Sequence, residues 1–237
     1  MLPSPARPAI SALPRSPARY RPRPMPDPLS EFRATLVRPE RLERVRHALA
    51  QRLGSLVVVC EAVRRRHNMS AILRTCEAFG VHEVHLVTEQ FRASQGAARG
   101  AERWVHTRAF GTAQESLDNL RDRGFDVYVA DLGEGAFSPA TVPIDRPLAI
   151  VFGSEVQGIS DYARSVATGV IRVPMVGLTE SLNVSVSAAI VVQRVAERRR
   201  DRAGADLDPA EQQRFVQAWL ASEEQAAIGL EARTATE

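Results

Sequence analysis

Two kinds of apolar pattern alternate along the chain. Short runs of β-branched and other apolar residues are typical of strands buried on both faces. These runs predict strands at 56–60, 84–87, 127–130, 148–152 and 170–173. Between them, apolar residues return at every third or fourth position, as on one face of a helix. These stretches predict helices at 39–53, 68–79 and 112–124, from 160, from 182 to about 202, and after 209.

Several predicted helix ends carry local signals of their own. Asn68 is placed to cap the second helix, and Gly80 follows its predicted end. Thr112 and Glu115 have the spacing of a capping box, and Ser160 precedes the next short helix.

Strands that alternate with helices predict an α/β fold, a mainly parallel sheet with helices on both faces. In such sheets ligands bind beyond the carboxyl ends of the strands. The loops in which we expect the functional residues are therefore those after Cys60, Val87, Ala130, Phe152 and Val173.

The first 30 residues differ in composition from the rest. They hold nine of the fifteen prolines and five arginines but only one acidic residue, Asp27. Such a segment cannot bury enough apolar surface to become ordered, and it has no continuous apolar core of a secretory signal. We expect a disordered basic tail.

The remaining composition indicates a soluble cytoplasmic protein. No run of about 18 apolar residues is present, so no membrane span is expected. Cys60 and Cys76 lie in apolar runs without CxxC spacing, which argues against a disulfide framework or a metal site and favours a reducing compartment.

Every strongly basic side chain is an arginine, and the formal net charge is +3. A guanidinium donates two parallel hydrogen bonds to a phosphate, so the composition is compatible with a polyanionic partner but does not require one.

Arginines gather in the loop after Cys60. Arg64, Arg65 and Arg66 precede the helix that begins near Asn68, and helix amide groups favour anions there. The segment is either a phosphate site or a solvated charge run followed by an asparagine cap. Arg74 lies off the apolar stripe of this helix and therefore faces solvent or a cleft.

Two later loops have small residues where a strand ends. Gly153 and Gly158 allow a ligand to approach the backbone, although the segment matches neither GxGxxG nor a P-loop. Glu155 between them is suited to hold a hydroxyl or to cap the next helix. Ser181 and Asn183 open the last apolar helix, which a capped core helix would explain only in part.

Taken together, three segments resemble motifs 1, 2 and 3 of the TrmH-type SPOUT RNA methyltransferases. They are residues 68–75, residues 152–159, and residues 171–175 continued by 181–185, in the family's order and spacing. The resemblance spans about 55–195. It implies a C-terminal trefoil knot, S-adenosyl-L-methionine as cofactor, and methylation of a ribose 2′-hydroxyl in RNA.

The resemblance also implies roles for individual residues. Arg74 is the implied catalytic arginine, and the residues that orient it and the ribose are Asn68, Glu155, Ser181 and Asn183. The residues implied to surround the cofactor are Ala130, Leu132, Gly153, Val173, Met175 and Leu182. The expected RNA contacts are Arg65, Arg66, Arg99 and Arg103, the last two in a region similar to the family's Gly-Ala-Glu-Arg-Trp-Val segment. The family often has Asp-Pro-His where Arg65, Arg66 and His67 stand here, so the entry to the helix lacks a proline and gains positive charge.

The domain organisation suggests the substrate. We expect a tail at 1–33, an N-terminal helix at 34–54, the methyltransferase domain at 55–200 and a helical extension at 201–237. This arrangement resembles the tRNA guanosine-18 2′-O-methyltransferases, which implies tRNA as partner and a homodimer. The alternatives are a ribosomal RNA 2′-O-methyltransferase of the same family and an RNA-binding module without catalysis.

Overall fold

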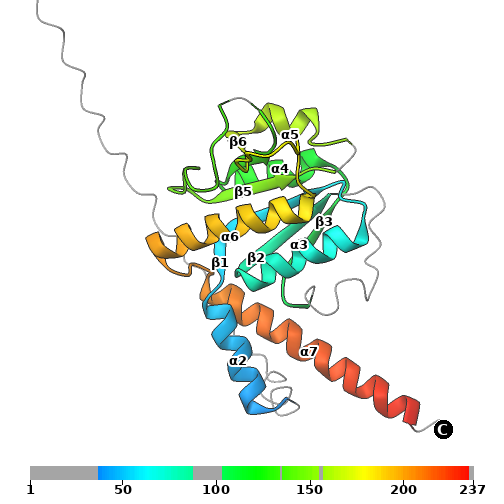
Figure 1. The fold of residues 1–237 in the computed structure, drawn as a ribbon. Coiled ribbons are helices and arrows are strands. Elements are labelled where there is room, and N and C mark those ends of the chain that lie inside the picture. Colours follow the sequence, from blue (N-terminus) through cyan, green and yellow to red (C-terminus); the bar gives the residue numbers. More distant parts are fainter. Residues whose placement is uncertain (1–36, 88–102, 134, 155–156, 235–237) are drawn as a thin grey trace, which may run out of the picture.

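The computed structural model describes residues 37–87, 103–133, 135–154 and 157–234, with 227–234 as backbone alone (Figure 1). The predicted tail at 1–33 and two candidate residues, Arg99 and Glu155, lie outside the described residues.

A wholly parallel six-stranded sheet forms the centre of the molecule. Its strands are β1 (Leu53–Glu61), β2 (Val81–Val87), β3 (His106–Phe110), β4 (Asp126–Ala130), β5 (Leu148–Phe152) and β6 (Gly169–Ile171). Their order across the sheet is β3-β2-β1-β5-β4-β6, so β5 lies between β1 and β4. The predicted α/β class and parallel sheet are confirmed.

Helices cover both faces of this sheet (Figure 1). On one face lie α3 (Arg66–Ala78) and α6 (Val184–Ala203), and on the other α4 (Ala113–Asp122) and α5 (Asp161–Val166). In β1, Val58 and Cys60 pack toward the first pair, whereas Val57 and Val59 pack toward the second. Burial on both faces explains why residues 56–60 of β1 and all of β5 are uninterrupted apolar runs.

Two flanking helices pack against each other beside the sheet (Figure 1). They are α2 (Pro39–Ala50) and α7 (Pro209–Thr234), joined by a third apolar cluster that includes Leu49 and Trp219. The carboxylate of Glu223 on α7 accepts hydrogen bonds from Arg41 and Arg103, each at 3.2 Å. The segments on either side of the sheet domain therefore form one structural unit.

The structure corrects three of the predicted elements. No strand was predicted at β3. The first helix ends at Ala50 rather than at residue 53, because Leu53 already pairs in β1. Asn68 does not cap α3, which begins at Arg66 with Arg65 at the cap position and no side-chain capping bond. The capping box of Thr112 and Glu115 and the cap by Ser160 are confirmed.

Two histidines in β2 are buried. His85 bonds Ser116 Oγ through Nδ1 at 2.8 Å and Glu83 through Nε2 at 2.6 Å, but His85 and Ser116 have no exposed surface, so no substrate can reach this serine. His82 stacks on His106, and within the described part of the chain neither of its ring nitrogens has a hydrogen-bond partner. Burial lowers the pKa of His82 to about 4.

Both cysteines are buried free thiols, and burial raises the pKa of Cys60 to about 12. Of the helices described, none has the length and apolar character needed to cross a bilayer.

Candidate active site and cofactor cavity

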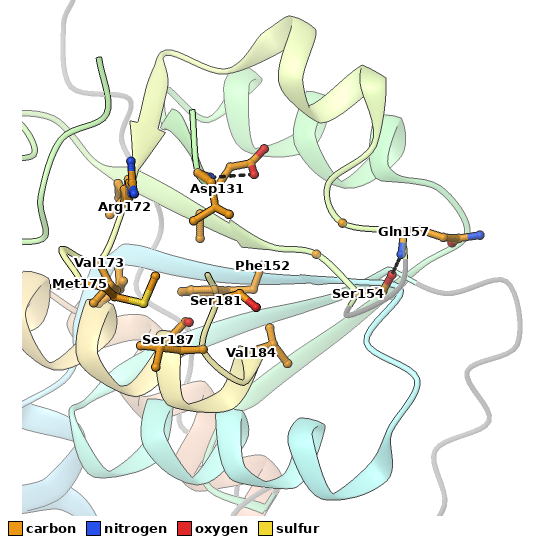
Figure 2. A pocket seen from close by; sticks show the side chains of 17 residues that line it. Asp131, Phe152, Ser154, Gln157, Arg172, Val173, Met175, Ser181, Val184 and Ser187 are labelled. Atoms are coloured by element: carbon orange, nitrogen blue, oxygen red, sulfur yellow. Dashed lines mark hydrogen bonds between the residues drawn. The ribbon is translucent and has the colours of Figure 1, made fainter. Parts of the chain in front are cut away.

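A cavity of about 490 Å³ lies at the carboxyl ends of β4, β5 and β6 (Figure 2). The loops after these strands and the start of α6 form its walls. All six residues that the resemblance implied for the cofactor line it: Ala130, Leu132, Gly153, Val173, Met175 and Leu182. Ser181 lines it as well. Residues far apart in sequence thus form one cavity at the predicted edge of the sheet.

Five polar residues of the wall were not predicted as site residues: Asp131, Ser154, Gln157, Arg172 and Ser187. Asp131 follows the last residue of β4 directly, and this position beyond a strand end is the one sequence signal for it, since a single carboxylate forms no motif. For Ser187, on the inner side of α6, the sequence carries no such signal.

Gly153 gives the cavity its tight turn after β5. Gly158 donates its backbone N–H to Ser154 at 3.0 Å and accepts one from it at 3.2 Å, which folds the loop back on itself. A Cβ on Gly153 would lie 2.2 Å from the carbonyl oxygen of Gly158 and 2.7 Å from the nitrogen of Ile159. No side chain fits there, because both neighbours are backbone atoms.

The third motif and the first meet through two asparagines. Asn183 donates its side-chain amide to Oδ1 of Asn68 at 3.2 Å. Its own Oδ1 accepts from the backbone N–H of Ser185 at 2.8 Å, so Asn183 is also the N-cap of α6. Asn68 is almost fully buried. The structure therefore brings these two candidate residues together, with Leu182 and Val184 on either side of Asn183 in the cavity wall.

Of the candidate arginines, those that the structure describes lie outside the cavity wall. Arg74 is exposed on α3, as its place off the apolar stripe predicts, and within the described residues no hydrogen bond or ion pair holds it. Arg65 and Arg66 are exposed at the start of α3. Arg103 is bound to Glu223 of α7. An unpaired guanidinium such as Arg74 is available to a phosphate.

The loop after β1 is tied to the loop after β5. Glu61 is buried, and its Oε2 accepts the backbone N–H of Ser160 at 3.1 Å. Ala62 follows with φ of 52°, a left-handed conformation that costs free energy in a residue other than glycine. The chain turns sharply there, and Arg64–Arg66 and α3 follow directly.

Asp131 is held from two sides. Its Oδ1 accepts the backbone N–H of Leu132 at 2.8 Å, and its Oδ2 pairs with the guanidinium of Arg164 on α5. The same guanidinium lies close to Gly158, so this ion pair joins the loop after β4 to the loop after β5.

Comparison with known proteins identifies the family to which this chain belongs. Residues 55–193 match the model of the SpoU rRNA Methylase family, a range that contains every strand of the sheet except the first two residues of β1.

Individual relatives match over a longer range. The tRNA (guanosine(18)-2'-O)-methyltransferase of Thermus thermophilus is 39% identical over 189 residues, which cover 76% of this chain and 95% of the relative. The enzyme of the same name from Escherichia coli is 36% identical over 186 residues, 75% of this chain and 81% of its own length. The crystal structure of the A. aeolicus TrmH/SpoU tRNA modifying enzyme matches with a TM-score of 0.70 and 30% identity, over 78% of this chain and 96% of that one.

Proposed function

Because the chain belongs to the SpoU rRNA methylase family, we propose that it is an RNA methyltransferase, which transfers a methyl group from S-adenosyl-L-methionine to a ribose 2′-hydroxyl. The substrate position is guanosine-18 of tRNA. The alignments with the two tRNA (guanosine(18)-2'-O)-methyltransferases exceed the length of the family domain and so include flanking sequence. In this chain the sequence on either side of the family domain forms α2 and α7.

The observation that carries the proposal is the cavity after β4, β5 and β6. Its volume lies within the range of about 300–1,000 Å³ that small-ligand sites have, and its wall is mostly apolar with a few polar groups. The turn at Gly153, into which no Cβ fits, lets a ligand approach the backbone. These features fit S-adenosyl-L-methionine, with Ala130, Leu132, Gly153, Val173, Met175 and Leu182 as its contacts.

The cofactor supplies a methyl group on a sulfonium, which a ribose oxygen can attack directly. The protein has to place the 2′-hydroxyl on that methyl group and to accept charge as the hydroxyl loses its proton. Asn183, between two residues of the cavity wall and bonded to Asn68, is placed to hold the ribose. Ser181 in the wall and Glu155 complete the proposed set of orienting residues.

Arg74 binds the substrate phosphate in this scheme and polarises the 2′-hydroxyl. An arginine stays protonated above pH 12, so a role as proton acceptor would demand an extreme environment. The side chain of Arg74 is exposed on α3. The bound cofactor would supply the methyl group and the sulfur leaving group, the guanidinium of Arg74 would stabilise negative charge on the ribose oxygen, and the hydroxyl proton would pass to solvent late in the transfer. Arg65, Arg66, Arg99 and Arg103 are proposed to bind further phosphates.

Contacts between α6 and the connection from β4 to β5 bear on the chain topology. Arg198 of α6 donates to the carbonyls of Pro139 and Val142, and Arg199 donates to those of Ile144 and Arg146. The connection from β4 to β5 thus packs against the C-terminal half of α6, and this contact supports the proposal of a C-terminal trefoil knot. A crystal structure in which α6 does not pass through that connection would remove this proposal.

A homodimer is supported by apolar side chains on the surface. Val186 and Ile190 lie one turn apart on α6 and are 46% and 40% exposed, and Val176 and Leu178, in the loop that precedes α6, are fully exposed. Such a patch beside a binding site is typical of an interface. Light scattering tests the homodimer, with Ile190→Arg expected to give monomers.

We place the enzyme in the cytoplasm, with residues 55–200 as its catalytic domain between the flanking helices.

Labelled S-adenosyl-L-methionine, offered with tRNA or with ribosomal RNA, tests the proposed function. We expect label in tRNA alone, and mapping of the product at the 2′-oxygen of guanosine-18. Label in ribosomal RNA would favour the alternative substrate. A folded protein that binds RNA but transfers no label to either pool would be a binding module instead.

A further inference from the structure

Asp131 is the single carboxylate among the described residues that line the cavity. It comes directly after β4, between Ala130 and Leu132, and Figure 2 shows it across the cavity from Val184 and Ser187. The family resemblance gave roles to both of its neighbours and none to Asp131. Its carboxylate is nevertheless fixed on both sides, because Leu132 and Arg164 hold its two oxygens.

We propose that Asp131 accepts hydrogen bonds from the ribose hydroxyls of the bound cofactor, and that Arg164 positions its carboxylate for this contact. The inference rests on the proposed function, since it takes S-adenosyl-L-methionine as the occupant of the cavity.

The ion pair of Asp131 with Arg164 favours neutral hydroxyl groups as ligands of this carboxylate. Arg164 already neutralises the carboxylate, so a second cation gains less from it than it would from an unpaired acid. The two oxygens of a carboxylate offer about four acceptor positions, and the known partners use two of them. The free positions suit neutral donors. A ribose presents two adjacent hydroxyls, and an acidic side chain near a strand end binds such hydroxyls in other parallel α/β sheets.

The position of Arg164 explains how the contact is kept in place. Its guanidinium lies beside Gly158, and it bridges α5 to the loop after β4. Loss of this arginine frees the Asp131 side chain to rotate away from the cavity. Arg164 therefore acts through Asp131 and has no need to touch the cofactor.

Calorimetry with the full-length protein tests the proposal without any turnover. The probes are S-adenosyl-L-methionine, 5′-methylthioadenosine, and 5′-methylthioadenosine without its 2′- or its 3′-hydroxyl. For Asp131→Ala we expect about ten- to hundredfold weaker binding of both hydroxylated probes, the usual effect of losing hydrogen bonds to a charged group. Removal of a hydroxyl should weaken binding to the unaltered protein but have little effect on binding to Asp131→Ala.

Arg164→Ala should reduce this discrimination between hydroxylated and deoxy probes, and Arg164→Lys should restore part of it. Asp145→Asn is the matched control, because Asp145 also pairs with an arginine, Arg202, but does not line the cavity. Unchanged melting temperatures ensure that all variants are folded.

Three results of these binding measurements would contradict the proposed role of Asp131. If Asp131→Ala weakens S-adenosyl-L-methionine but not 5′-methylthioadenosine, the carboxylate binds the amino-acid end and the proposal is wrong. It is also wrong if all probes bind Asp131→Ala as they bind the unaltered protein. If the unaltered protein itself binds none of the probes, the proposed function fails, and the inference fails with it.

Discussion

The side chains of Asn68 and Asn183 are joined by a hydrogen bond of 3.2 Å, although 115 positions separate them in sequence. Asn68 belongs to the helix that carries Arg74, and Asn183 stands in the wall segment that bounds the cofactor cavity. This bond is therefore the direct link between the proposed RNA-binding and cofactor-binding halves of the site.

Asn183→Ser separates two roles of Asn183, the N-cap of α6 and the hydrogen bond to Asn68. Serine is an equally good N-cap for α6 but is too short to reach Asn68. We expect the free energy of unfolding to fall by about 1 kcal/mol, the usual net contribution of one hydrogen bond, because only the bond to Asn68 is lost. Methyl transfer at saturating substrates should fall at least tenfold, on the order of what a small misplacement costs. Urea unfolding and single-turnover rates measure the two effects, and an unchanged rate would show that the link has no function.

Arg74→Lys keeps the positive charge and removes the planar guanidinium. We expect about a hundredfold slower methyl transfer, because a lysine offers a point charge and no paired donors. Affinity for S-adenosyl-L-methionine should not change, because Arg74 does not line the cavity. Arg121→Lys, at an exposed position on α4, is the control. A modest rate loss with a retained steep pH dependence would contradict the importance of guanidinium geometry.

Gly153→Ala tests the turn after β5. The new Cβ would lie 2.2 Å from the Gly158 carbonyl oxygen, so the backbone of the loop has to move. We expect more than a tenfold loss of cofactor affinity by calorimetry. Gly177→Ala, in a nearby loop with no atom within 4 Å of its Cβ position, should bind normally. Equal affinities in the two variants would mean that the turn does not shape the cavity.

His82 should make the protein less stable in mild acid. Its pKa is about 4 in the folded protein, against an ordinary 6.5, because burial disfavours its charged form. Stability is complete above pH 6.5 and falls as the pH approaches 4, since only the unfolded chain then takes up a proton. Between pH 7.5 and pH 5 this histidine should account for about 2 kcal/mol. Urea unfolding of His82→Phe should show a pH dependence smaller by that amount, and an identical pH dependence would contradict the assignment.

Much of the fold can be read from the sequence, for a physical reason visible in β1 and β5. Strands covered on both faces must be apolar throughout, so Leu148–Phe152 is identified to the residue. The strand β3 (His106–Phe110) has only one neighbouring strand and mostly exposed or half-buried side chains, so no apolar run marks it. The order of the strands also leaves no periodic signal, because it depends on which connections cross the sheet.

In the candidate site, too, the sequence predicts some features and leaves others without a signal. Asn68 has the residue type and position of an N-cap, but the helix begins two residues earlier and the side chain bonds Asn183 instead. Local spacing cannot detect a partner so far away, and only the resemblance between motifs grouped these two residues. Asp131 was missed, although it directly follows a predicted strand, because a single carboxylate has no pattern.

The strand order has a consequence for the newly made chain. The strand β5, which fills the place between β1 and β4, is synthesised after both of them. Until residues 148–152 leave the ribosome, the central strand β1 has an unpaired edge that can join the strand of another chain. The cavity wall at 173–187 arrives later still. Folding of this enzyme therefore has to wait for its C-terminal half, and a chain interrupted between β4 and β5 is expected to aggregate rather than to form a smaller stable domain.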